Sequence, residues 1–246
     1  MKVVVCIPAR YGSVRFPGKV LAKLGGKPVV QWVYEKAAAT SADEVLVATD
    51  DQRVMEAVQG FGGKAVMTSP HHPSGTDRIW EATQGSGADV VVNIQGDEPL
   101  IAVESIERFI RLFRERPDLE MATMVVRADR EKLAGNPNIV KAVLDKSHFA
   151  LYFSRACVPF LREGGEDCGV YQHWGVYGFR RETLERFVSL PEGALEKCEK
   201  LEQLRALENG IRIYALVAER PHGVGIDTEA DLREAERIVA AEGGLG

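Results

Sequence analysis

The sequence lacks any apolar run close to the ~20 residues that a membrane-spanning helix needs. Met1 and Lys2 lead straight into an apolar run of about five residues, which is too short for the core of a signal peptide. Internal repeats and low-complexity segments are also absent. We therefore expect a cytoplasmic protein whose 246 residues form one large domain, or one domain with a sizeable insertion.

Cysteine is scarce, and the spacing of the four that occur is uninformative for metal binding. No Cys-x-x-Cys pair is formed by Cys6, Cys157, Cys168 and Cys198. This argues against a zinc site and against a disulfide scaffold. A net charge of −5 argues against a broad nucleic-acid surface, although it is compatible with a local basic pocket for a nucleotide.

Three common motifs are missing as well. A P-loop protein is excluded because Gly-x-x-x-x-Gly-Lys-Ser/Thr does not occur, and a hydrolase with a nucleophile elbow is excluded because Gly-x-Ser-x-Gly does not occur. The turn after the first apolar run lacks Gly-x-Gly-x-x-Gly, which argues against dinucleotide binding.

What the sequence does contain is a basic loop directly after its first apolar run. Val3–Ile7 predicts a buried strand, and the glycines and prolines of Pro8–Lys19 disfavour a helix there. The loop carries the cations Arg10, Arg15 and Lys19, and its glycine lets successive backbone amides surround an anion. Such a loop suits a triphosphate, and a solvated basic turn is the alternative interpretation.

Apolar strands alternate with amphipathic helices through the first half of the chain, which predicts a mainly parallel α/β sheet flanked by helices. The expected strands are Val3–Ile7, Glu44–Ala48, Lys64–Met67 and Asp89–Ile94, with helices beginning at Pro28, after Asp51, at Ser74 and at Val103. Sheets of this kind bind ligands beyond the carboxyl ends of their strands. The basic loop and the segment Gln95–Pro99 both lie at such ends.

The second half of the chain is less regular. The expected strands are Met121–Val126, Val140–Leu144, Ala150–Ser154, Gly175–Phe179 and Ile211–Val217, with helices over Glu182–Val188 and Leu195–Asn209 and a final helix opened by a capping box at Thr228–Asp231. The charged, Gly-rich stretch Arg162–Gly169 predicts an exposed loop. We expect residues 1–246 to form a single domain with an inserted, partly antiparallel region at about 120–185.

Two aspartates are candidate ligands for a divalent cation. Asp97 follows a buried strand in a Gly-Asp-Glu-Pro turn, where a carboxylate either holds a cation or accepts from nearby amides. Asp227 directly precedes the final helix and is either a second metal carboxylate or an ordinary helix-start acid. Glu98 is a weaker candidate, because Pro99 favours an extended conformation that turns it away.

A segment at the start of one helix has two interpretations. Ser74, Gly75 and Arg78 are able to read the polar edge of a base. A plain helix cap, with Thr76 as a capping residue, is the more frequent use of such a segment.

Polar residues in the second half also have two interpretations. His173, Tyr177 and Arg155 lie among apolar residues, where a histidine is more often a core or interface residue than a catalytic one. Glu202 and Gln203 belong to a charged run that is typical of a solvated helix face.

Taken together, these segments resemble the 3-deoxy-manno-octulosonate cytidylyltransferases, also called CMP-KDO synthetases. The matching segments follow one another in the expected order: Pro8–Lys19, Ser74–Arg78, Gln95–Pro99, Asn136–Lys141, Ala150–Arg155, Leu201–Arg205 and Gly225–Thr228. Sialate cytidylyltransferases are related but carry a different Gly-Ser-Lys pattern in the loop. The departure from the family is the short Gly/Glu stretch at 163–169, which concerns the sugar site.

The resemblance implies a Rossmann-like nucleotidyltransferase fold and the reaction CTP + KDO → CMP-KDO + pyrophosphate. It also implies Mg²⁺, a cytoplasmic homodimer formed through the inserted region, and a place in lipopolysaccharide biosynthesis. Three cations and two metal carboxylates would supply the positioning and charge neutralisation that such a transfer requires.

Residue roles follow from the same resemblance. Lys19, Arg10, Asp97 and Asp227 would be catalytic, with both aspartates holding the metal. The nucleotide site would comprise Ala9, Arg10, Ser13, Arg15, Lys19, Ser74, Gly75, Arg78 and Gln95. The sugar side would comprise Arg155, His173, Tyr177, Glu202 and Gln203.

Two other functions stay open at this point. A sugar-1-phosphate nucleotidyltransferase shares the fold and a similar loop, but its nucleophile is a phosphate. A non-catalytic nucleotide-binding module would need the basic loop but not both Asp97 and Asp227. Measuring pyrophosphate release with different acceptors distinguishes a sugar-1-phosphate nucleotidyltransferase from a KDO cytidylyltransferase. Metal-dependent turnover distinguishes an enzyme from a binding module.

Overall fold

The computed structural model describes residues 1–13, 15–219, 223 and 225–241. These residues divide into two compact units. The first contains Met1–Glu115 and the described residues from 223 onward, and the second runs from Arg116 to Glu219. Helices flank mostly parallel strands in the first unit, and antiparallel pairs appear in the second, so the predicted α/β class is confirmed.

Parallel strands form the sheet of the first unit in the order β6-β1-β4-β5. Their bounds are Val3–Pro8 (β1), Glu44–Thr49 (β4), Ala65–Met67 (β5) and Val90–Asn93 (β6). All of β1 is buried, as a strand covered on both faces must be.

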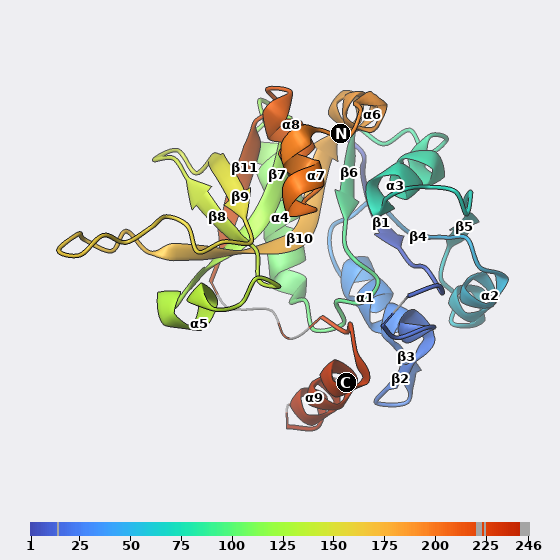
Figure 1. The fold of residues 1–246 in the computed structure, drawn as a ribbon. Helices are drawn as coiled ribbons and strands as arrows, with labels where there is room; N and C mark the ends of the chain where they lie inside the picture. The colour runs from blue at the N-terminus through green and yellow to red at the C-terminus, as the bar shows by residue number, and fades with distance from the viewer. Residues whose placement is uncertain (14, 220–222, 224, 242–246) are drawn as a thin grey trace. The chain divides into compact units, whose positions relative to one another are not determined.

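Helices cover this sheet on both faces. Their bounds are Val29–Ala38 (α1), Gln52–Gly60 (α2), Gly75–Thr83 (α3) and Val103–Glu115 (α4). Right-handed crossovers place α3, which returns from the edge strand β5 to β6, on the opposite face from α1 and α2. Figure 1 shows this arrangement, with α3 on one side of the strands and α1 and α2 on the other.

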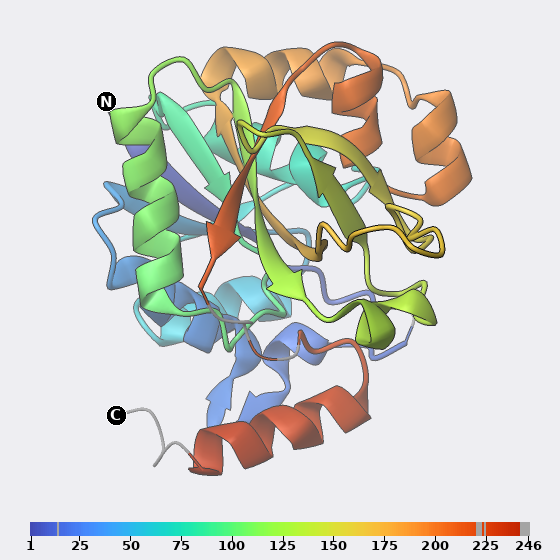
Figure 2. The same cartoon turned by 90° about the vertical axis from the view of Figure 1, so that its left-hand side faces the viewer.

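The C-terminal helix α9 (Glu229–Ala241) packs against the N-terminal hairpin of the first unit, in both Figure 1 and Figure 2. The hairpin consists of β2 (Lys23–Leu24) and β3 (Lys27–Pro28). Its two turn glycines have φ angles of 55° and 86°, and positive φ at both central residues is what a two-residue type I′ turn requires. A buried cluster joins the two elements: Leu24, Val29, Trp32, Ile226, Ala235 and Val239. Apolar packing of Ile226, and of Ala235 and Val239 in α9, therefore holds this helix and the segment before it beside the hairpin and the start of α1.

In the second unit, β7 (Met121–Ala128) pairs in parallel with β11 (Ile213–Ala218) and antiparallel with β10 (Val170–Arg180). A further antiparallel set contains β8 (Lys141–Leu144) between β9 (Ala150–Ser154) and β10. Residues 160–168, between β9 and β10, are exposed, which confirms the predicted exposed loop. The short helix α5 (Arg130–Ala134) and the helix α6 (Arg181–Ser189) also belong to this unit.

The prediction of one helix over Leu195–Asn209 is wrong. The chain forms α7 (Ala194–Glu199) and α8 (Gln203–Glu208), separated by Lys200 with a φ of 53°. Residues nine apart lie on opposite sides of a straight helix, at 100° per residue. The break brings Glu196 and Arg205 together in a buried, two-bonded ion pair at 2.6 and 2.8 Å.

None of the helices in the described part of the chain is long and apolar enough to cross a membrane.

Candidate active site

Strand β1 delivers the basic loop at the carboxyl end of the parallel strands. Ala9 is buried and donates its amide to the carbonyl of Ala48 in β4, at 2.9 Å. Arg10 donates to the carbonyl of His72, at 3.1 Å. Among the described residues no carboxylate pairs with this guanidinium, so its charge is available to an anion.

The loop closes on itself at Tyr11. The carbonyl of Tyr11 accepts the amides of Ser13, at 3.0 Å, and of Gly18, at 2.8 Å. Gly18 has a φ of 73°, in the left-handed region that glycine tolerates. Lys19 then begins a single 3₁₀ turn, Lys19–Leu21, which orients its side chain.

Lys19 joins the two predicted metal carboxylates. Its Nζ donates to Asp97 Oδ2 and to Asp227 Oδ1, the second at 2.8 Å. The amide of Ile226 donates to the carbonyl of Asp97, at 2.8 Å, and thereby ties the segment before α9 to the turn after β6. Arg15 donates to Asp227 Oδ2, also at 2.8 Å. Four residues predicted from the sequence therefore form one cluster of two cations and two carboxylates.

Mutual attraction sets the ionisation of this cluster. Burial alone would lower the pKa of Lys19, but Asp97 and Asp227 outweigh it and raise that pKa. Burial would likewise raise the pKa of Asp227, yet Lys19 and then Arg15 lower it. At neutral pH the ammonium and this carboxylate are therefore both charged.

The expectation that Glu98 turns away is wrong. A Cβ on Gly225 would lie 2.9 Å from Glu98 Oε1, so the acid occupies the space that this glycine leaves. Burial, followed by the charges of Asp97 and Asp227, raises the pKa of Glu98 to about 8. At neutral pH the carboxyl group of Glu98 is therefore mostly protonated, and it lies beside the charged cluster. The backbone preference before proline carries no information about this contact.

The donor set of the cluster suits Mg²⁺. This ion takes hard oxygen ligands, commonly one or two carboxylates together with waters and substrate phosphates. Asp97 and Asp227 offer two such carboxylates, with side chains 25% and 47% exposed. No set of three or more acidic, histidine or cysteine side chains suited to a metal occurs within the described residues. The arrangement fits an ion completed by phosphate and water rather than one caged by protein.

Ser74 is the N-cap of α3. Its hydroxyl oxygen accepts the amides of Thr76, at 3.1 Å, and Asp77, at 3.2 Å, and its hydroxyl donates to Asp77 Oδ2, at 2.6 Å. The expectation that Thr76 caps this helix is therefore wrong, because Thr76 is a buried residue inside it. The cap does not exclude base recognition, which stays a prediction.

Gly75 and Gln95 lie close together beside the end of β1. A Cβ on Gly75 would lie 3.5 Å from Pro8 Cγ and 4.0 Å from Gln95 Oε1. Gln95 also donates to Asn93 Oδ1, at 3.3 Å. The start of α3, the end of β1 and the turn after β6 thus converge, as expected for a ligand site at the carboxyl ends of parallel strands.

Arg78 lies in the core of the first unit. It is completely buried, and its guanidinium donates to Asp50 Oδ2, at 2.6 Å, and to Thr68 Oγ1, at 2.5 Å. Its Nε has no hydrogen-bond partner among the described residues. Both terminal nitrogens of this guanidinium thus donate to groups inside the protein. The contact with cytosine that the resemblance implies stays a prediction.

His173 and Tyr177 lie on β10 in the second unit, with ring centroids 5.5 Å apart. His173 Nε2 is 2.9 Å from the hydroxyl oxygen of Thr123, which donates to the carbonyl of Val176 and so accepts from the imidazole. Burial lowers the pKa of His173 to about 3 and raises the pKa of Tyr177 well above 10. Both side chains are therefore neutral, and a packed, hydrogen-bonded histidine matches the structural interpretation.

The side chain of Arg155 binds backbone carbonyl groups. Its three side-chain nitrogen groups donate to the carbonyls of Glu199, at 2.8 Å, Pro137, at 3.0 Å, and Lys200, at 3.3 Å. Its amide also donates to the Glu199 carboxylate, at 2.9 Å. Arg155 thereby satisfies the end of α7 and stabilises the bend before α8.

The bend places Glu202 and Gln203 in a different environment from the predicted solvated face. Gln203 is 4% exposed, and its Nε2 has no hydrogen-bond partner among the described residues. The charge of Glu202 contributes to the raised pKa of Tyr177, so these two side chains are neighbours. The solvated-face interpretation is therefore wrong for Gln203, and a contact of its amide with the sugar stays a prediction.

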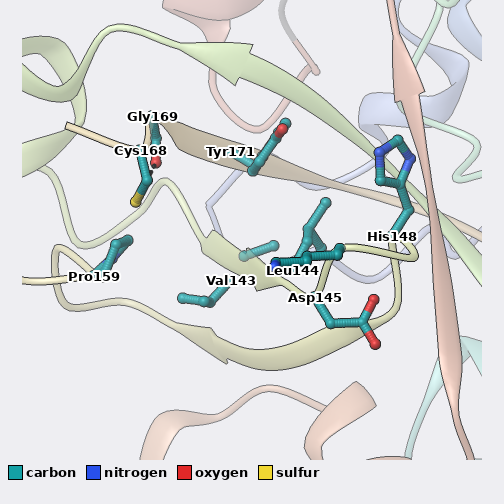
Figure 3. Close-up of a pocket in the computed structure, with 10 residues that line it drawn as sticks. Val143, Leu144, Asp145, His148, Pro159, Cys168, Gly169 and Tyr171 are labelled. Atoms are coloured by element: carbon teal, nitrogen blue, oxygen red, sulfur yellow. Dashed lines mark hydrogen bonds between the residues drawn. The ribbon is translucent and has the colours of Figure 1, made fainter. Parts of the chain in front are cut away.

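A cavity of about 290 Å³ lies elsewhere in the second unit, and Figure 3 shows its lining. It is bounded by β8 with the turn after it, and by Pro159, Cys168, Gly169 and Tyr171. None of the site residues predicted from the sequence lines this cavity. The candidate active site therefore does not include it.

Sequence reasoning missed several partners of the site residues. Asp50 holds Arg78, Thr123 orients His173, and Glu199 fixes the backbone of Arg155. Each pair joins positions between 28 and 50 apart in the chain. No local pattern signals such contacts, because they depend on how the strands and helices pack.

The parallel strands, the basic loop and the paired carboxylates at one edge define a nucleotide-binding α/β protein of the nucleotidyltransferase type. Residues 4–213 match the model of the cytidylyltransferase family. The chain is 49% identical to a 3-deoxy-manno-octulosonate cytidylyltransferase of Thermodesulfovibrio yellowstonii, over 96% of this chain and 98% of that protein. It is 48% identical to an 8-amino-3,8-dideoxy-manno-octulosonate cytidylyltransferase of a Shewanella species, over 98% of this chain and 100% of that protein.

A solved structure is similar along the whole chain. CMP:2-keto-3-deoxy-manno-octonic acid synthetase, complexed with CTP, superposes with a TM-score of 0.94 at 42% identity, covering 98% of this chain and 100% of that one. This chain belongs to the cytidylyltransferase family.

Proposed function

We propose that this protein transfers CMP from CTP to the anomeric hydroxyl of KDO, releasing pyrophosphate and forming CMP-KDO for lipopolysaccharide biosynthesis. The observation that carries the proposal is the cluster in which Lys19 joins Asp97 and Asp227 beside Arg15. The similarity to a KDO cytidylyltransferase and to a CTP-bound CMP-KDO synthetase supports the choice of substrates.

The three cations of the loop have two tasks in this reaction. Arg10 and Arg15 bind phosphate oxygens, and Lys19 opposes the negative charge that grows at the α-phosphate. The sugar oxygen forms a bond to the α-phosphorus while the bond from that phosphorus to the pyrophosphate oxygen breaks, and the hydroxyl proton leaves to solvent. Mg²⁺ held by Asp97 and Asp227 would neutralise triphosphate charge and lower the pKa of the attacking hydroxyl.

The residues that we propose for the sugar side bind through neutral hydrogen-bonding groups rather than through charged ones. The spare Nε2 of Gln203 and the hydroxyl of Tyr177 suit sugar hydroxyls, which both donate and accept hydrogen bonds. Arg155 would act by holding the bend that carries Glu202 and Gln203, because its own nitrogens already donate to backbone carbonyls. His173 would keep the wall of the site in place rather than move a proton.

The test is pyrophosphate release with CTP and a panel of acceptors, with Mg²⁺ and with a chelator. We expect turnover with KDO, loss of turnover in the chelator, and little turnover with ATP or with sugar-1-phosphates. Since relatives named for the 8-amino sugar are nearly as similar, that sugar belongs in the panel as a competing acceptor. A preference for a sugar-1-phosphate would overturn the proposal, and CTP binding without turnover would favour a binding module.

We further infer a cytoplasmic homodimer formed through the region around 120–185. Exposed large apolar side chains occur there at Leu151, Phe160 and Leu161, with exposures of 60%, 86% and 39%. Contact with a second copy would remove these side chains from water. Sedimentation at micromolar concentration should show a dimer, and Phe160→Asp should weaken it. A monomer in the unmodified protein would contradict this inference.

A further inference from the structure

The ring of Tyr11 is the internal support of the loop Pro8–Lys19. A Cβ on Gly18 would lie 2.9 Å from Tyr11 Cε2 and 3.0 Å from Cζ, so the glycine backbone packs directly against the ring. The amide of Gly18 donates to the carbonyl of the same tyrosine, at 2.8 Å. Both ends of the segment that carries Arg15 therefore meet at Tyr11, immediately before Lys19.

Arg53 covers this ring from helix α2. Its guanidinium carbon lies 3.4 Å from the centroid of the Tyr11 ring, a stacked cation–π contact. Asp51, the N-cap of α2, fixes the guanidinium by accepting from Arg53 Nε, at 2.9 Å, and from the terminal nitrogen, at 2.7 Å. The hydrogen bonds from Arg53 lower the pKa of Asp51, so this pair is charged at neutral pH.

We propose that Arg53 is a positioning residue for the nucleotide-binding loop: stacked on Tyr11 and held by Asp51, it keeps Arg15 and Lys19 in place before CTP binds. The proposal rests on the proposed function and adds to it a residue outside the loop. A loop must be ordered when triphosphate binds to it, and a loop that is already ordered avoids that entropic cost. Arg53 needs no contact with substrate to exert this effect.

Arg53→Ala and Tyr11→Ala should raise the KM for CTP about tenfold and leave kcat within about twofold, because a preordering contact contributes equally to ground-state and transition-state binding. Tyr11→Phe keeps the ring and should behave like the unmodified protein. Arg53→Lys should have a KM for CTP close to that of Arg53→Ala, since an ammonium group neither stacks as a plane nor binds Asp51 through two nitrogens. The double variant Tyr11→Ala/Arg53→Ala should be no worse than either single one.

The chain contains a matched control for the same contact. Arg116 donates through Nε and a terminal nitrogen to Asp118, at 2.8 and 2.7 Å, and lies over the ring of Tyr214 at 5.5 Å. Like Arg53, it is exposed and pairs with an aspartate two positions away, but it belongs to the second unit. Arg116→Ala should leave the KM for CTP unchanged.

Two further readouts separate positioning from stability. CTP binding measured by calorimetry without acceptor should weaken by the same factor in Arg53→Ala, and this result does not depend on which sugar is used. Trypsin should cut after Arg15 faster in Arg53→Ala, while Tm stays close to that of the unmodified protein. An unchanged Kd for CTP and unchanged cleavage would overturn the proposal even if KDO turnover is normal, whereas failure of KDO turnover alone would overturn only the proposed function.

Discussion

The two groups of candidate residues differ in how the protein holds them. In the first unit, Lys19, Arg15, Asp97 and Asp227 are charged, and each of these charges faces an opposite one. In the second unit, His173, Tyr177 and Gln203 are neutral and packed among buried neighbours. Triphosphate and metal require fixed charge, whereas an uncharged sugar hydroxyl is best read by neutral donors and acceptors.

This difference between the two sets of candidate residues predicts which property of the protein a mutation in each set will change. A charged cluster in contact with solvent gains its strength from a ligand that excludes water, so a loss of charge is expected to appear in turnover. Buried neutral groups depend on packing, so their loss is expected to appear in substrate affinity or in the pH dependence of stability rather than in turnover. Mutations that remove one property at a time test this division.

The largest effect is expected for the carboxylates. Asp97→Asn or Asp227→Asn should lower kcat about 10³-fold or more, because shape is kept while the charge that holds the metal is lost. The double variant should be little worse than the worse single one, since the two act as a unit. Measuring kcat across a Mg²⁺ titration checks this.

A matched control for the carboxylates lies at the other end of the same sheet. Asp89 precedes β6 and accepts from the amide of Lys2, and Asp89→Asn should leave turnover unchanged. Near-normal activity of Asp227→Asn at saturating Mg²⁺ would show that Asp227 is only a helix-start acid.

Next in size is the loss of the bridging cation. Lys19→Ala should lower kcat about 10²-fold while CTP binding weakens less, because its charge opposes one that develops in the transition state. Arg15, with a side chain 63% exposed, should contribute mainly to the KM for CTP. A change confined to KM in Lys19→Ala would contradict the catalytic role. Lys27→Ala, which removes an exposed pair with Glu35, is the control.

The neutral histidine predicts a pH effect on stability rather than on turnover. The pKa of His173 is about 3 in the folded protein, below its ordinary 6.5, so the unfolded chain binds this proton more readily. Stability is therefore complete above pH 6.5 and is lost as pH falls from 6.5 toward 3, by up to about 1.4 kcal/mol per pH unit. Denaturation between pH 7 and 5 should show a smaller decline in His173→Gln. An inflection in kcat that vanishes in His173→Gln would instead indicate proton transfer.

The smallest effect is expected for the buried amide. Gln203→Met keeps the volume and removes the donor, and should raise the KM for KDO about fivefold, as for one neutral hydrogen bond. The KM for CTP should not change. Because the Nε2 has no partner within the described residues, Tm should stay equal or rise. A fall in Tm with an unchanged KM would mean that Gln203 is only structural.

Local patterns predicted much of this molecule. The four parallel strands of the first unit were expected within one residue at each end, whereas the short strands of the hairpin were not expected. The capping box at Thr228 is present, with Asp231 accepting the Thr228 amide at 2.8 Å. The structure brings Asp97 and Asp227 to the same ammonium group of Lys19, as expected from the resemblance, which assigned both aspartates to one site. The predictions of the strands and of the capping box succeeded because hydrophobic period and turn chemistry are local properties.

The failures have a common physical origin. The single helix over Leu195–Asn209 divides because Arg155 and a buried ion pair stabilise a bend, and Glu98 turns inward because Gly225 leaves space for it. Each outcome depends on a partner remote in the sequence. Propensity cannot anticipate a contact that exists only after the chain has packed.

The sequence by itself determined the α/β class, the basic loop after the first strand and the identity of the ionisable residues. The spacing of apolar residues, the positions of glycines and the types of ionisable side chains are properties of the chain that do not depend on which residues come into contact. Only the tertiary structure decided which opposite charges pair, which ionisable side chains are buried in neutral form, and which side-chain nitrogens lack a partner among the described residues. Those properties follow from burial and from neighbours: Lys19 between two carboxylates, His173 against Thr123, and Arg53 stacked on Tyr11.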